Sequence, residues 1–107
     1  FTSKLLFKDW KLGAAEHEFT VMRLRSQRTV ADEEIEVVQT LLDRYDPESG
    51  VSSMSRTTGY TCTAGAGLLL NGLFTEKGCF PPEIIGMKDT CFDYVLNHLK
   101  ERNITFS

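Results

Sequence analysis

The segment Asp46-Pro47-Glu48-Ser49-Gly50 divides this chain into two parts with different patterns of apolar residues. Aspartate favours the first position of a β-turn, proline presets the φ angle of the second, and glycine closes the turn. The residues before the turn are patterned mainly as strands, and those after it are spaced as in helices. The order strand, strand, helix, helix predicts an α+β fold, in which an antiparallel strand pair is followed by two helices.

Two strands are predicted before the turn. In Glu18–Gln27, apolar residues lie on both faces, so we expect a strand that is at least partly covered on both sides. Glu34–Tyr45 fits either a helix, with apolar residues at i, i+3, i+6, i+7 and i+10, or a strand, because Ile35 and Val37 alternate with glutamates. We favour a strand that pairs antiparallel with the first through a polar loop, Arg28–Glu34.

A helix is predicted within Ser52–Gly72. Ser55, Thr57 or Thr58 could cap its N-terminus by accepting a hydrogen bond from a free backbone N–H group. Asn71-Gly72 is a natural end, because glycine accepts the left-handed conformation after a helix. The consecutive small residues Ala64 to Gly67 cost helix propensity, and we interpret them as a surface for close packing against another element.

The rest of the chain is predicted as a loop, a last helix and two terminal segments. Leu73–Pro82 is the loop, and the helix runs from Glu83 or Asp89 to Arg102. The apolar tail Ile104–Phe106 either docks or frays. Phe1–Gly13 could be the end of a helix that stops at Gly13. The apolar stripe of the last helix comprises Phe92, Val95, Leu96 and Leu99.

Composition places the chain among ordinary globular domains. Of its 107 residues, 41% are hydrophobic and 25% charged, and the net charge of −3 gives no sign of a nucleic-acid surface. No apolar run approaches the roughly 20 residues of a membrane span. The chain starts at Phe1 with no secretory signal, so we expect residues 1–107 to be a single fragment of a larger, cytoplasmic protein.

The three cysteines, Cys62, Cys79 and Cys91, are predicted to be reduced thiols. Their number is odd, their spacing is irregular, and no C-x-x-C pair occurs. Both histidines lie far from them in sequence, so we expect no metal site. Cys62 and Cys91 fall in apolar helical contexts, where cysteine behaves as a small hydrophobic residue.

The run from Ser52 to Tyr60 is the richest in groups that could bind a ligand. Its hydroxyls, the Arg56 guanidinium and a helix N-terminus could together bind a phosphate or a carboxylate. The simpler interpretation, which we favour on chemistry alone, is a capping segment with Arg56 in a salt bridge.

Two other motifs invite a functional interpretation that we do not favour. The carboxylates in Glu16-His17-Glu18 could tune the imidazole, but an exposed polar start to a strand explains the motif better. Gly65–Gly72 superficially suggests a dinucleotide loop, yet its spacing is wrong and no strand leads into it. The chain offers no identifiable set of nucleophile, base and orienting residue.

The stretch Tyr45–Tyr60, with its run Ser-Met-Ser-Arg-Thr-Thr-Gly-Tyr, resembles the C-terminal region of glutamate-forming saccharopine dehydrogenases, also called saccharopine reductases. The similarity extends upstream through His17–Met22 and downstream through Leu70–Gly72 and Lys77–Glu83. It therefore covers most of the chain, from about Leu12 onward. In this family the corresponding run opens a helix after a strand, which also favours the strand interpretation of Glu34–Tyr45.

The resemblance implies a larger oxidoreductase of lysine metabolism. Its missing N-terminal Rossmann domain would bind NAD(P), and a second domain would bind saccharopine and help to form a homodimer. The reaction would oxidise saccharopine by hydride transfer and release glutamate and 2-aminoadipate 6-semialdehyde. This chain would be the C-terminal part of the second domain, with Arg56, Thr57 and Thr58 near the ligand cleft. It would hold no catalytic, cofactor-binding or metal-binding residue and would be inactive alone.

Alternatives to a saccharopine dehydrogenase remain open. Ser55 stands where the family commonly has alanine, and Tyr60-Thr61-Cys62 departs from its usual continuation. A relative that acts on another amino-acid conjugate, such as carboxynorspermidine, would fit these departures. A stand-alone interaction or dimerisation module would need no catalysis, and a small anion-binding regulator would use the helix start at Thr57.

Overall fold

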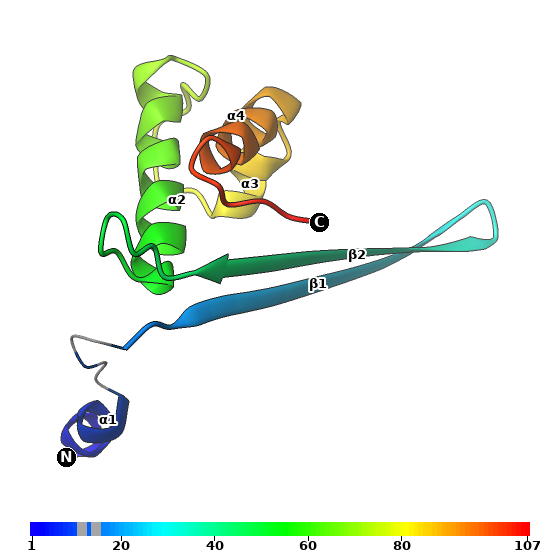
Figure 1. The fold of residues 1–107 in the computed structure, drawn as a ribbon. Helices are drawn as coiled ribbons and strands as arrows, with labels where there is room; N and C mark the ends of the chain where they lie inside the picture. The colour runs from blue at the N-terminus through cyan, green and yellow to red at the C-terminus, as the bar shows by residue number, and fades with distance from the viewer. Residues whose placement is uncertain (11–12, 14–15) are drawn as a thin grey trace.

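The computed structural model describes residues 1–10, 13 and 16–107, and it has the α+β architecture predicted from the sequence (Figure 1). A two-stranded antiparallel ribbon carries a small group of helices on one side of one end, and an N-terminal helix lies apart from that group. The elements in chain order are α1 (Thr2–Trp10), β1 (Phe19–Val30), β2 (Glu33–Arg44), α2 (Ser53–Leu70), α3 (Pro82–Gly86) and α4 (Asp89–Lys100).

Helix α1 is the N-terminal helix that the sequence predicts within Phe1–Gly13. It ends at Trp10, and the predicted stop at Gly13 borders positions 11–12 and 14–15, which lie outside the described residues. Within the described part of the chain, α1 packs against none of the other helices or strands. The packed part of the described chain therefore begins with β1.

The ribbon is longer and its turn tighter than the sequence suggests. Pairing runs without a break from Phe19 opposite Arg44 to Val30 opposite Glu33. Only Ala31 and Asp32 remain for the turn, with φ angles of 51° and 63°. Two residues at positive φ match the right-handed twist of the flanking strands. The predicted loop over Arg28–Glu34 is therefore wrong, because the backbone ladder continues through most of it.

The expected cover on both sides of the first strand is also wrong within this chain. Phe19 is 67% exposed and Val21 59% exposed, and most of β1 is open to solvent on both faces. Helix α2 packs only against the end of the ribbon near Phe19 and Arg44, which we call the root. The remainder projects away from the helices, and no helix among the described residues covers it (Figure 1).

The turn predicted at residues 46–50 is confirmed. The Asp46 carboxylate accepts hydrogen bonds from the Glu48 N–H and the Ser49 hydroxyl, and Gly50 has a φ of +69°. The Gly50 N–H donates to the Asp46 carbonyl, which closes the turn. This turn forms the connection between β2 and α2.

The predicted C-terminal end of α2 is correct, and its predicted N-cap residue is wrong. Ser52 is the N-cap residue, and its hydroxyl accepts a hydrogen bond from the Ser55 N–H at 3.2 Å. Ser55, Thr57 and Thr58 lie inside the helix, because α2 begins at Ser53, earlier than the polar run indicates. Asn71 is the C-cap and Gly72 follows with a φ of +68°, as expected.

Helices α2 and α4 pack together through the small residues predicted for this purpose. Ala64 is fully buried, and the Tyr94 ring of α4 lies directly over Gly67. Gly65 faces open space, so its absence of a side chain serves no packing role here. Beside this contact, Leu68, Phe74 and Cys91 form one hydrophobic cluster.

The last predicted helix is two helices, and its tail docks. Met87 and Lys88 separate α3 from α4, and the sequence left the start at Glu83 or Asp89 open. Ile104 is 3% exposed and joins Leu41 and Leu99 in a second cluster. Backbone hydrogen bonds between Thr40 and Ser107 tie the tail to the outer edge of β2.

The cysteines are unpaired thiols, but only one behaves as a core residue. Cys91 is fully buried, whereas Cys62 and Cys79 are exposed. The apolar environment expected for Cys62 is therefore wrong, because it lies on the solvent side of α2. None of the described helices is long and apolar enough to cross a lipid bilayer.

The contact between α2 and α4 leads to a test with two matched glycines. In Gly67→Ala the new Cβ would overlap the Tyr94 hydroxyl and lie 3.1 Å from Cζ of that ring. We expect a loss of about 1–3 kcal/mol in unfolding free energy. In Gly65→Ala the Cβ meets nothing within 4 Å, and we expect a gain of up to about 1 kcal/mol. Urea unfolding measures both, and equal effects would contradict the close approach.

Candidate functional site

Arg56 lies in the second turn of α2 and points toward the root of the ribbon. It is 8% exposed, and its guanidinium lies 3.4 Å from the Asp43 carboxylate and 3.6 Å from that of Asp46. Its NH2 group donates a 2.8 Å hydrogen bond to the Arg102 carbonyl oxygen. Its Nε is buried and has no hydrogen-bond partner among the described residues, so it meets Asp43 through charge attraction alone. The salt bridge favoured from the sequence is thus confirmed.

Arg56, Asp43, Ser53 and Thr20 form a polar cluster that involves both strands. Asp43 is 4% exposed, and its carboxylate accepts a 2.8 Å hydrogen bond from the Ser53 hydroxyl. The same hydroxyl lies 2.8 Å from that of Thr20 on β1. A buried carboxylate is costly unless it is paired and hydrogen-bonded, and both conditions hold here. The polar cluster therefore connects α2 to β1 and β2.

Glu18 binds the N-terminus of α2. Its carboxylate accepts hydrogen bonds from the backbone N–H groups of Ser53 and Met54, the latter at 3.0 Å. The first turn of α2 contains no acidic residue of its own, so Glu18 supplies the negative charge that a helix N-terminus favours. Sequence reasoning missed this role, because the partners are 35 and 36 positions apart and only the missing acidic residue hinted at it.

His17 has a different neighbour from the one its sequence context suggests. Its ring stacks on Tyr45 with centroids 4.2 Å apart. Glu18, one of the two flanking carboxylates that could have tuned it, binds the start of α2 instead. The exposed polar start of a strand is therefore the better description of this segment.

Thr57 and Thr58 do not converge with Arg56 on one point. The Thr57 hydroxyl donates to the Ser53 carbonyl at 3.0 Å, within its own helix, and Thr58 is exposed. Consecutive helical residues point about 100° apart, so only one of the three can face the ribbon fully. A role of these residues near a ligand stays a prediction.

A cavity of about 390 Å³ lies beside Arg56 and has a rim of mixed charge. Arg44 and Arg56 supply positive groups, and Asp46 and Glu48 supply negative ones. Such a rim can pair with both ends of a zwitterion. It is lined by Leu42, Asp43, Arg44, Tyr45, Asp46, Pro47, Glu48, Arg56 and Asn103.

The glycine-rich run of α2 does not have the geometry of a dinucleotide-binding loop. Gly65 and Gly67 lie in the middle of α2, whereas a phosphate loop needs glycines between a strand and the start of a helix. The described residues contain no group of three His, Cys, Asp or Glu side chains placed to hold a metal ion.

Removing the guanidinium from the cluster should be costly. Arg56→Met leaves the buried Asp43 carboxylate without its charge partner, and we expect a loss of about 3–5 kcal/mol in unfolding free energy. Arg25→Met, which breaks the exposed ion pair with Glu36, should cost about 1 kcal/mol or less. Urea unfolding of both variants measures the difference. Similar losses of unfolding free energy would contradict the conclusion that Arg56 holds α2 to the ribbon.

The turn should respond to acid through Asp46. Hydrogen bonds from the Ser49 hydroxyl and the Glu48 N–H, with the nearby Arg56 charge, hold the pKa of Asp46 below its ordinary value of 3.8. Because the folded-state pKa is lowered, this stabilisation is present above pH 3.8 and is lost as the pH falls toward the lower, folded-state value.

We therefore expect Asp46→Asn to flatten the decline in stability at pH values below 3.8. Glu48→Gln is the matched control, because it removes a charge from the same turn. Thermal melting at a series of pH values measures both variants. An acid decline in Asp46→Asn as steep as in the unmodified chain would contradict the assignment.

The sequence of this chain is similar to a known protein family. No solved structure matches the chain. A family model described as "Saccharopine dehydrogenase C-terminal domain" matches residues 1–104 of 107. The match spans the ribbon, the polar cluster and all the helices, and it confirms the resemblance seen in the sequence. The chain belongs to the saccharopine dehydrogenase C-terminal domain family.

Proposed function

We propose that the chain completes the substrate domain of an NAD(P)-dependent, saccharopine dehydrogenase-like oxidoreductase of lysine metabolism. The enzyme converts saccharopine to glutamate and 2-aminoadipate 6-semialdehyde in the cytoplasm and acts as a homodimer. An N-terminal Rossmann domain outside this chain binds NAD(P) and carries out the hydride transfer. This chain contributes the wall of the substrate domain and no catalytic residue. Membership of the dehydrogenase family supports the proposal.

The exposed apolar surface of the ribbon is the observation that carries this proposal. A two-stranded ribbon is marginal in water unless another layer covers it. Large exposed apolar patches in turn mark surfaces for interaction. In the proposed enzyme, the rest of the substrate domain and the second protomer would provide the cover. The apolar residues exposed by 39% to 59% beyond the root are Val21, Met22, Leu24, Val30, Val37 and Val38.

The cavity beside Arg56 supports the substrate class. Saccharopine carries carboxylates and amino groups, and the rim of this cavity offers both guanidinium and carboxylate partners. Arg56 lines the cavity while it is held by Asp43 and Asp46, so we assign it to shaping the cleft. Thr57 and Thr58 follow it on α2. The three unpaired thiols fit a reducing compartment.

The natural gene product that contains this chain provides the test. We expect it to form NAD(P)H, followed by absorbance, when saccharopine is added, and to release one glutamate per turnover. The 107-residue chain alone should give no signal under the same conditions. Turnover of carboxynorspermidine in place of saccharopine would change the substrate assignment. No dehydrogenase activity with either conjugate would favour an interaction module and contradict the proposal.

A further inference from the structure

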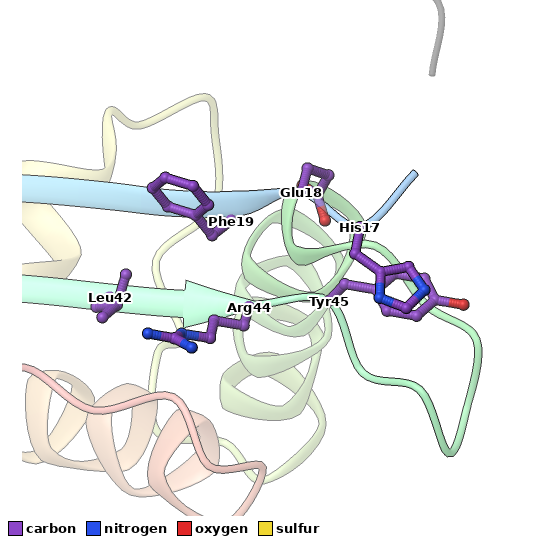
Figure 2. Close-up of a pocket in the computed structure, with 6 residues that line it drawn as sticks. All are labelled: His17, Glu18, Phe19, Leu42, Arg44 and Tyr45. Carbon is purple, nitrogen blue, oxygen red and sulfur yellow. The ribbon is translucent and has the colours of Figure 1, made fainter. Parts of the chain in front are cut away.

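A second hollow lies at the root of the ribbon, where the chain enters β1 and leaves β2 (Figure 2). It has a volume of about 550 Å³, within the range of pockets that hold small molecules. It adjoins the cavity beside Arg56, because Leu42, Arg44 and Tyr45 line both. Its lining residues are His17, Glu18, Phe19, Leu42, Arg44 and Tyr45.

Aromatic and aliphatic groups form most of the hollow. The rings of His17 and Tyr45 stack nearly parallel, with 16° between their planes (Figure 2). By the register of the ribbon, Phe19 and Leu42 share one face, and they are 67% and 52% exposed. Exposed apolar side chains beside a stacked aromatic pair offer a contact surface for a flat or aliphatic body.

Arg44 supplies a positive charge that no described residue neutralises. It is exposed and forms no hydrogen bond or ion pair within the described part of the chain, in contrast to Arg56. The neighbouring Asp43 points to the opposite face, where Arg56 and Ser53 hold it. The Glu18 carboxylate is bound by the N–H groups at the start of α2, so it does not compete for Arg44.

We propose that this hollow binds a small carboxylic acid whose carboxylate is attached to an aromatic or aliphatic body. The carboxylate pairs with Arg44, whose planar guanidinium matches its two oxygens. The body lies against the His17–Tyr45 stack and the side chains of Phe19 and Leu42. This ligand site shares Arg44 with the rim of the cavity beside Arg56, and binding there needs neither cofactor nor reaction.

Isothermal titration of the natural gene product with 3-phenylpropionate tests the site. Two further probes divide the interaction: 3-phenylpropan-1-ol keeps the body without the charge, and acetate keeps the charge without the body. We expect each to bind about tenfold more weakly than 3-phenylpropionate, because each lacks one of the two contacts.

Arg44→Gln should weaken binding of 3-phenylpropionate by about 10-fold to 100-fold, since it removes a charged hydrogen-bond donor. Arg23→Gln is the matched control: Arg23 is an exposed arginine on the same face of the ribbon, outside the hollow, and its replacement should change nothing. Phe19→Ser provides an independent variant that removes the apolar wall and retains Arg44.

No binding of 3-phenylpropionate to the unmodified protein would overturn the proposal, as would equal binding by Arg44→Gln and Arg23→Gln. Unchanged binding by Phe19→Ser would also contradict it. Because the titration needs no turnover, its failure leaves the dehydrogenase assignment untouched. Loss of the dehydrogenase assignment likewise leaves the titration result standing.

Discussion

The buried ion pair between Asp43 and Arg56 joins the two halves of this molecule. Asp43 lies on β2 opposite Thr20, one pair from the end of the ribbon, Arg56 lies on the helix that follows, and both are almost fully buried. The Ser53 hydroxyl donates a hydrogen bond to Asp43, and Glu18, the residue before β1, binds the helix N-terminus. A buried charge of this kind is tolerated only when all its partners are in place. The angle between ribbon and helices therefore depends on this cluster.

The elements with local signals could be predicted from the sequence. Asp46, Pro47 and Gly50 mark a turn by their own backbone preferences, and Asn71-Gly72 marks a helix end in the same way. Ala31 and Asp32 gave no such signal, because an Ala-Asp pair is an uncommon choice for a two-residue turn at positive φ. Contacts between distant residues, above all Glu18 with Ser53, could not be seen in a pattern that is read locally.

The polar run around Arg56 stands out in the sequence, but a role of its residues near a ligand stays a prediction. The run around Arg56 was identified as the richest in polar groups, and the structure places it at the junction of ribbon and helix, beside a cavity. Its guanidinium, however, is held by Asp43 and Asp46, whereas the exposed Arg44 nearby has no such partner among the described residues. The two arginines differ in burial, because Arg56 is buried and Arg44 is exposed. Patterns in a single sequence do not report the burial of a charged residue. Family membership and the exposed ribbon are the observations that support the proposal of a larger enzyme.

A double-mutant cycle between Asp43→Asn and Arg56→Gln tests most directly whether this ion pair holds the ribbon to the helices. Urea unfolding of the two single variants and the double variant gives the coupling free energy between the side chains. The account predicts a coupling of about 1–3 kcal/mol, because each residue then depends on the other for its burial. Effects that add within about 0.5 kcal/mol would show that the two side chains act independently, and they would contradict the account.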